Sequence, residues 1–259
     1  MSSTVGCKTE SMSGVMIVTG GSRGIGAATC KLAAEAGFDI VVNYARDVSA
    51  ANDVVDACVA AGVRAISVQA DVANEAAVIE LFDRAERELG PITALVNNAG
   101  IVHPQMRFDE MSVDRWREVI DVNVIGSFIC AREAARRMST LHGGRGGVIV
   151  NVSSAASYMG SPGEYVDYAA SKAAIDTLTL GLGKELANEG VRVNAVRPGV
   201  ITTEIHASGG EPNRAYRVAP SVPMQRPGGP EEVAATIMWL ASPASSYITA
   251  ATINCSGGR

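Results

Sequence analysis

The sequence predicts an α/β fold in which one domain is built on a doubly wound parallel sheet with helices on both faces. Short apolar runs alternate with segments of helical composition along the whole chain. The apolar runs are continuous, which is typical of parallel strands buried on both faces. A glycine-rich stretch joins the first apolar run to the first helical segment. With right-handed crossovers, these observations predict about seven strands arranged as a Rossmann fold.

Each element follows from a local pattern. Apolar runs predict strands at 15–19, 40–43, 64–69, 94–97, 148–152, 191–196 and 249–254. Helical patterns predict helices at 24–36, 48–61, 74–89, 113–138, 165–189 and 231–241, and glycines at 62, 90 and 190 end three of them. Ser112 is expected to cap the helix that ends at residue 138. Residues 1–14 are expected to form a flexible tail, which leaves 15–259 as a single domain.

Composition and charge exclude several classes of protein. Apolar residues make up 47% of the chain and charged residues 19%, which is enough to fill a core and unlike a disordered chain. The formal net charge is −5 without a basic stripe, so we expect no nucleic-acid or membrane-surface partner. No apolar run is long enough to span a bilayer, and the first residues lack the apolar core of a signal peptide. We therefore expect a cytoplasmic protein.

The five cysteines stand at positions 7, 30, 58, 130 and 255, and no two have metal-ligand spacing. Cys30, Cys58 and Cys130 fall in apolar helical patterns, which favours buried free thiols. Free, buried cysteines are typical of proteins in a reducing compartment. The three histidines are scattered along the chain, so we expect no metal site.

Residues 200–229 form the one long irregular segment, rich in proline and glycine. Loops of this length inside compact domains are often lids or binding loops. We expect a loop on the substrate side of a site, and a tolerated surface insertion is the alternative.

Residues 19–26 read Thr-Gly-Gly-Ser-Arg-Gly-Ile-Gly and open the first helix. Glycines allow the backbone to turn tightly and to approach a pyrophosphate without Cβ clashes. The helix N-terminus offers free N–H groups and a positive dipole end. A glycine cluster placed in a strand–turn–helix unit predicts dinucleotide binding. The turn residues expected at the cofactor are Gly20, Ser22, Arg23, Gly24, Ile25 and Gly26.

Tyr168 and Lys172 lie four residues apart in a helical pattern and therefore share one face. A free tyrosine has a pKa of about 10, too high for easy proton exchange near neutral pH. A nearby ammonium favours the phenolate and lowers that pKa. Such a pair is common by chance, but together with a dinucleotide-binding turn it predicts Tyr168 as a general acid/base with Lys172 as its partner.

Several motifs occur in a fixed order, namely Thr19-Gly20-x-x-x-Gly24-x-Gly26, Asn97-Asn98-Ala99-Gly100, Asn123, Tyr168-x-x-x-Lys172 and Pro198-Gly199. In order and spacing the chain resembles the short-chain dehydrogenase/reductase family from residue 15 to the C-terminus. The resemblance implies an enzyme that transfers a hydride between a nicotinamide cofactor and a carbonyl or alcohol. The chain also resembles the glucose 1-dehydrogenase-like and ketoacyl reductase-like members.

The resemblance implies roles for further residues. It assigns Asp71 and Val72 to the adenine, Asn98, Ala99 and Gly100 to the ribose side, and Pro198, Gly199, Ile201 and Thr203 to the nicotinamide end. Lys172 would also hydrogen-bond the nicotinamide ribose. Asn123 would hold a water in a proton relay to Lys172, and the alternative is a helix-bending asparagine bonded to backbone. The family likeness further implies a homotetramer built through the two long helices and the C-terminal segment.

The end of the second strand bears on the choice of cofactor. An NAD site usually places an acidic residue there to bind the ribose 2′-hydroxyl. Here the strand ends in Asn43-Tyr44-Ala45-Arg46, and Arg46 and Arg23 are expected to bind a 2′-phosphate. We therefore expect NADP, while the neighbouring Asp47 keeps NAD possible.

A hydroxyl is expected beside Tyr168 to polarise the substrate oxygen. Relatives usually carry a serine thirteen residues before the tyrosine, where this chain has Ala155. One extra residue in 161–167 would restore Ser154, which we prefer, and Ser153 is the alternative.

These observations predict an NADP-dependent oxidoreductase that acts on a small-molecule carbonyl or secondary alcohol. A catalytically silent NADP(H)-binding sensor is the alternative, although an intact Ser, Tyr, Lys and Asn set argues against it. The physiological substrate and the preferred direction of reaction stay open, because a fold does not choose a substrate.

Overall fold

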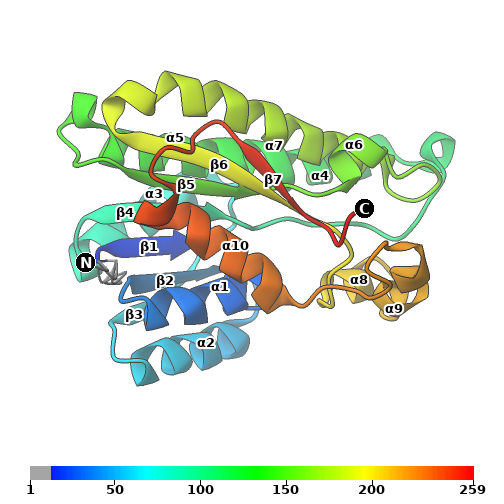
Figure 1. The fold of residues 1–259 in the computed structure, drawn as a ribbon, viewed down its shortest axis with the longest axis horizontal. Coiled ribbons are helices and arrows are strands. Elements are labelled where there is room, and N and C mark those ends of the chain that lie inside the picture. The colour runs from blue at the N-terminus through cyan, green and yellow to red at the C-terminus, as the bar shows by residue number, and fades with distance from the viewer. Residues whose placement is uncertain (1–12) are drawn as a thin grey trace, which may run out of the picture.

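Seven strands form one parallel sheet in the computed structural model, which describes residues 13–259 (Figure 1). The strand order is β3-β2-β1-β4-β5-β6-β7, which confirms the doubly wound sheet. The strands are β1 Val15–Val18, β2 Asp39–Tyr44, β3 Ala65–Gln69, β4 Ile92–Asn97, β5 Gly147–Val152, β6 Val191–Pro198 and β7 Thr252–Cys255. The order reverses between β1 and β4, and ligands of such sheets bind at the carboxyl ends beside that reversal.

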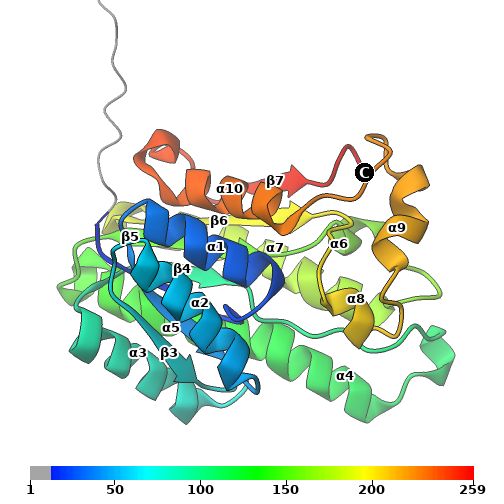
Figure 2. The ribbon, with the colours of Figure 1, turned by 90° about the horizontal axis from the view of Figure 1, so that it is seen from below.

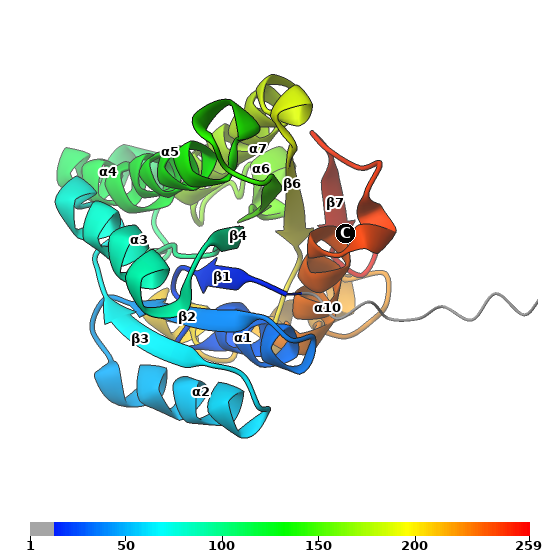
Figure 3. The ribbon, with the colours of Figure 1, turned by 90° about the vertical axis from the view of Figure 1, so that its left-hand side faces the viewer.

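Helices cover both faces of the sheet, as Figure 3 shows end-on. The helices are α1 Gly24–Glu35, α2 Val48–Ala60, α3 Glu75–Leu89, α4 Val113–Ile120, α5 Ser127–Met138, α6 Ala156–Met159, α7 Val166–Glu185, α8 Ile205–Ser208, α9 Arg214–Val218 and α10 Pro230–Ala241. One core joins α1, α2 and α10 to the sheet and includes Met16, while a second lies under α3 and α5 and includes Ile17. Successive strand residues point to opposite faces, so continuous apolar strands are needed to fill both cores.

The helix expected over 113–138 is interrupted. Residues Asp121–Gly126 form a π-helical turn between α4 and α5. The side chain of Asn123 binds both backbone groups of Ile101, and the Ser127 hydroxyl donates to the Asn123 carbonyl at 3.0 Å. Side-chain bonds of this kind compete with the regular helical ladder, and π-turns are frequent at functional sites.

The segment 200–229, expected to be irregular, contains α8 and α9. Both lie beyond the carboxyl ends of the strands (Figures 1 and 2). Helices of four and five residues were not predicted, and neither was α6, because one turn shows no apolar periodicity. The last strand begins at Thr252 instead of residue 249, since Ala250 has a left-handed φ of 59° that a strand does not accept.

The cysteines follow the expectation where the structure describes them. Cys30, Cys58 and Cys130 are buried free thiols, and Cys255 is free and partly exposed. Burial raises the pKa of the Cys58 thiol to about 11 and that of Cys130 to about 12. Cys7 and most of the expected tail lie outside the described residues. Within residues 13–259, no helix is both long and apolar enough to cross a membrane.

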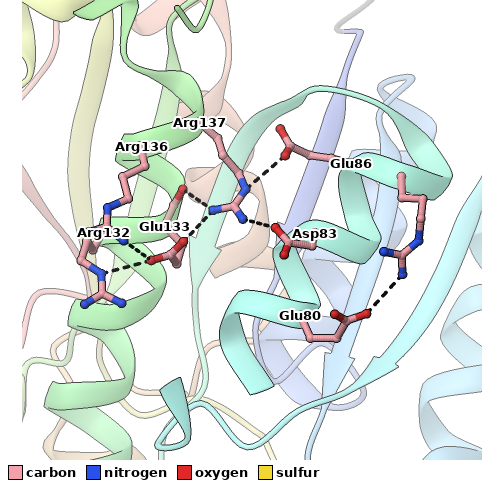
Figure 4. Close-up of polar contacts among 8 residues, drawn as sticks. Glu80, Asp83, Glu86, Arg132, Glu133, Arg136 and Arg137 are labelled. Atoms are coloured by element: carbon pink, nitrogen blue, oxygen red, sulfur yellow. Dashed lines mark hydrogen bonds and ion pairs between the residues drawn. The ribbon is translucent and has the colours of Figure 1, made fainter. Parts of the chain in front are cut away.

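An ion-pair network joins α3 to α5 (Figure 4). Its centre is Glu133, whose side chain is 4% exposed and accepts from Arg132 at 3.1 Å, Arg136 at 3.1 Å and Arg137 at 2.7 Å. Arg137 also pairs with Asp83 of α3. Burial alone would raise the pKa of Glu133, but these arginines lower it overall. A charged Glu133 therefore stabilises the folded state.

Glu133→Gln is expected to lower the free energy of unfolding at pH 7 by about 2 kcal/mol. The loss is smaller than for a wholly buried pair because two of the arginines reach solvent. The carboxylate contributes above its unfolded pKa, near 4.5, and its contribution is lost as the pH falls through the lower folded value. Urea denaturation at pH 7 and below pH 4.5 should therefore show the difference shrinking in acid. Arg84→Met breaks the exposed α3 pair with Glu88 and is the matched control. A Glu133→Gln protein as stable as that control would contradict a stabilising role for the Glu133 carboxylate.

Candidate active site

A cleft of about 1290 Å³ opens at the carboxyl ends of the strands and runs from the glycine-rich turn to α8 and α9. Most of the residues predicted for the site line it. They are Gly20, Ser22, Arg23, Gly24, Ile25, Asn43, Tyr44, Arg46, Asp71, Val72, Asn98, Ala99, Gly100, Ser154, Tyr168, Lys172, Pro198, Gly199, Ile201 and Thr203. Gly26 and Asn123 are buried and do not line the cleft.

The glycine-rich turn leaves the start of α1 free for an anion. Gly20 and Gly24 have φ values of 61° and 53°, which side chains rarely adopt. A Cβ on Gly26 would lie 2.3 Å from the Gly20 carbonyl oxygen, so only glycine fits there. Arg23 stands at the N-cap without a side-chain cap bond. The first N–H groups of the helix are therefore uncapped by side chains and fit a pyrophosphate.

Two asparagines hold this turn in place. Asn98 donates from Nδ2 to the carbonyls of Thr19 at 2.9 Å and Gly20 at 3.0 Å. Asn43 accepts from the Gly20 amide at 3.2 Å and donates to the Ala70 carbonyl at 3.0 Å. The amides thus connect the turn to the carboxyl ends of β2, β3 and β4, and the Asn43 side chain already has its hydrogen-bond partners within the protein.

Two arginines line the cleft, Arg23 at the N-cap of α1 and Arg46 two residues beyond the end of β2. Both are exposed. Among the described residues, neither has an ion-pair partner. Asp47, which kept NAD possible, accepts from the Ala50 amide at 3.0 Å and caps α2. Its carboxylate therefore has a structural partner at the start of that helix.

Tyr168 comes from the first turn of α7 and meets a serine from the end of β5. Both side chains line the cleft, and Ser154 lies close enough to the Tyr168 phenol to lower its pKa. Ser153 is 2% exposed, and its hydroxyl donates instead to the Lys172 carbonyl at 3.0 Å. Of the two candidate serines, the structure therefore brings Ser154 to Tyr168.

Burial governs both ionisable groups. It raises the pKa of Tyr168, and the nearby Ser154 hydroxyl and the Arg214 charge only partly offset this effect. Burial also lowers the pKa of Lys172 to about 8, against the opposing charge of Asp176. The pKa of Tyr168 was expected to be lowered by Lys172 and is raised in this structure. The physical reason is that burial removes solvation from the phenolate, and this destabilises it more than the neighbouring groups stabilise it.

Lys172 lies at the inner wall of the cleft and donates from Nζ to the Val152 carbonyl at 2.9 Å. Asn123 accepts from the Ile101 amide at 2.8 Å and donates to the Ser171 hydroxyl at 3.0 Å. A Cβ on Gly100 would lie 3.2 Å from Asn123 Oδ1 and 3.3 Å from Lys172 Nζ. The two side chains therefore flank the same short space. The bonds of the Asn123 side chain to backbone agree with the alternative of a helix-bending asparagine. That alternative is compatible with a role in a proton relay.

The far end of the cleft is lined by residues that no sequence motif marks. The Arg214 guanidinium lies 5.3 Å from the centre of the Tyr165 ring and pairs with Glu164 at 2.5 Å. His206 contacts the Ile201 carbonyl through Nε2 at 2.8 Å, and burial lowers its pKa. These residues come from short helices and loops, where no periodic signal marks which side chains converge.

Known proteins are similar to this chain over nearly its whole length. The family model described as enoyl-(acyl carrier protein) reductase matches residues 20–259. The uncharacterized oxidoreductase YgfF of Escherichia coli K12 is 51% identical over 245 residues, which cover 95% of this chain and 99% of that protein. A 3-oxoacyl-[acyl-carrier-protein] reductase of Synechocystis is 42% identical over 245 residues, 94% of this chain and 96% of that protein.

Two further relatives bear on the family. Glucose 1-dehydrogenase 2 of Bacillus subtilis is 37% identical over 242 residues, which cover 93% of each protein. The crystal structure of a short-chain type dehydrogenase/reductase from Mycobacterium marinum matches with a TM-score of 0.87 at 35% identity, over 94% of both chains. These matches confirm the resemblance inferred from the sequence motifs. The chain belongs to the short-chain dehydrogenase/reductase family and is an NAD(P)-dependent oxidoreductase acting on CH–OH or C=O groups.

Proposed function

We propose that the protein is an NADP-dependent oxidoreductase that interconverts a carbonyl and a secondary alcohol, with Tyr168 as the general acid/base. The observation that carries the proposal is the meeting of Ser154, Tyr168 and Lys172 in the cleft that the glycine-rich turn opens. A bound nicotinamide would supply or accept the hydride. No observation favours the alternative of a silent cofactor sensor.

In this proposal the Tyr168 hydroxyl delivers its proton to the carbonyl oxygen during reduction and takes a proton from the alcohol during oxidation. Burial keeps Tyr168 protonated in this structure, so the phenol holds the proton that a reduction needs, and the positive charge of a bound oxidised nicotinamide would lower its pKa. Ser154 donates to the same substrate oxygen and stabilises its developing charge. Lys172 orients the cofactor ribose, and Asn123 holds the water that links Lys172 to solvent.

The proposed cofactor contacts follow the cleft. The uncapped start of α1 binds the pyrophosphate, Asp71 and Val72 bound the adenine, and Ile201 and Thr203 bound the nicotinamide. Residues 200–229 form the substrate side of the single domain 15–259. We propose a homotetramer as well, supported by large apolar side chains left exposed on α5 and α7, such as Phe128 and Leu180. Sedimentation equilibrium would measure its mass.

NADP is favoured over NAD because Arg23 and Arg46 are exposed, line the cleft and have no ion-pair partner among residues 13–259. Arg46→Ala is expected to raise KM for NADPH by about 10- to 100-fold, since a charge-assisted hydrogen bond contributes about 1.5–3 kcal/mol. KM for NADH should change little, because NADH lacks the 2′-phosphate. Steady-state kinetics with both cofactors measures the two effects. Equal changes for both cofactors would overturn the 2′-phosphate role.

The function itself is tested by the consumption of NADPH and NADH against a panel of carbonyl compounds. Sugar, steroid, acyl-thioester and other carbonyls belong in the panel, since the relatives include a 3-oxoacyl-[acyl-carrier-protein] reductase and a glucose 1-dehydrogenase. Turnover of one chemical class with NADPH is the expected result. Cofactor binding without turnover of any class would count against the enzyme proposal and favour the sensor.

A further inference from the structure

A buried ion pair joins α4 to the start of α7. Arg115 Nε lies 2.6 Å from Asp167 Oδ2, and Arg115 Nη2 lies 3.2 Å from Asp167 Oδ1. The two side chains are 8% and 4% exposed. Such a fork is the strongest geometry available to the two groups. Burying both charges nevertheless costs about as much as the pairing returns, so general stability is a weak explanation for the pair.

Each partner makes one further bond that points to a local role. Asp167 Oδ1 also accepts from the backbone N–H of Tyr168 at 2.9 Å. Arg115 Nη1 donates to the Pro104 carbonyl at 2.7 Å. The pair therefore fixes the backbone of Tyr168 to α4 and to the chain that follows Gly100, which are two walls of the same cleft.

Tyr168 depends on such support because of its place in α7. It is the third residue of the helix, and the first N–H groups of a helix have no partners within it. Tyr165 at the N-cap makes no side-chain cap bond. The Asp167 carboxylate accepts from one of these free N–H groups, as an N-cap side chain would, and its negative charge is favoured at the helix N-terminus. Without it, fraying of the first turn would reach Tyr168.

We propose that Arg115 and Asp167 are positioning residues that hold Tyr168 in place for proton transfer. The inference rests on the proposed function of Tyr168. Lys172 lies one turn further along α7 and has its own bond to Val152. Breaking the pair therefore displaces the phenol and leaves Lys172 and the glycine-rich turn in place.

The variants Asp167→Asn and Arg115→Lys test the proposal. Each is expected to lower kcat about 10- to 100-fold, since small misplacements of a reacting group cost this much. The Kd of NADPH should change little. The solvent deuterium isotope effect on kcat should increase, because proton transfer becomes slower. Arg84→Met, which breaks an exposed pair on α3, is the control and should change none of these values. An unchanged kcat, or a Kd that weakens in parallel with kcat, would overturn the proposal.

Hydrogen-exchange mass spectrometry supplies a test that needs neither a substrate nor a stable variant. In the wild-type protein, the amides at residues 166–169 should exchange more slowly than those of a frayed helix end. Exchange there as fast as in an unstructured peptide would overturn the proposal even if the enzyme assay succeeds. Slow exchange together with failure to turn over any carbonyl would contradict the proposed function and leave the positioning of Tyr168 supported.

Discussion

Tyr168→Phe is expected to lose nearly all turnover while retaining cofactor affinity. The phenyl ring keeps the packing at the start of α7, but the proton donor beside Ser154 is removed. General acid–base catalysis contributes about 10²- to 10⁴-fold to a rate, so kcat should fall by that range. Stopped-flow or steady-state consumption of NADPH measures kcat, and fluorescence titration measures Kd.

Tyr247→Phe is the control for this substitution. Tyr247 is fully exposed and does not line the cleft, so its kcat should equal that of the wild type. A Tyr168→Phe enzyme that keeps a tenth or more of the wild-type turnover would remove Tyr168 from the mechanism. A loss of kcat with an equal loss of NADPH affinity would indicate damage to the cofactor site instead.

Gly26→Ala is expected to disable the dinucleotide site. The added methyl group would lie 2.3 Å from the Gly20 carbonyl oxygen and 2.7 Å from Asn98 Nδ2. A backbone carbonyl cannot move away without opening the turn. Overpacking costs about 1–3 kcal/mol, and here the cost falls on the turn that holds the pyrophosphate. The Kd of NADPH should therefore rise by about 10- to 100-fold.

Lys31→Ala on the same helix is the matched control, because Lys31 is exposed on α1. Exposed changes of this kind usually alter stability by less than about 0.5 kcal/mol. Titration with NADPH and thermal unfolding should be run on both variants. An unchanged Kd in Gly26→Ala would show that the turn tolerates a side chain, against the close approach seen between Gly26 and Gly20.

The sheet could be read from the sequence because its signals are local. Continuous apolar strands and the glycines that end helices depend only on neighbouring residues, and they placed six of the seven strands within about two residues. The helix expected over 113–138 contains a π-helical turn at 121–126, where Asn123 bonds to Ile101, 22 residues away, and such a distant contact leaves no local pattern in the sequence. Short helices such as α9 were missed because one turn carries no periodicity.

By itself, the sequence determined the family and the reaction class, because its motifs hold residues of defined chemistry in a fixed order. Only the tertiary structure decided how these residues meet. Ser154 lies close to Tyr168, whereas the Ser153 hydroxyl donates to the Lys172 carbonyl, and this arrangement favours Ser154 of the two candidates. The direction of the Tyr168 pKa and the pairing of Arg115 with Asp167 depend on burial and on contacts between distant segments. Neither property has a local signature, because desolvation and ion pairing arise only when the chain has folded.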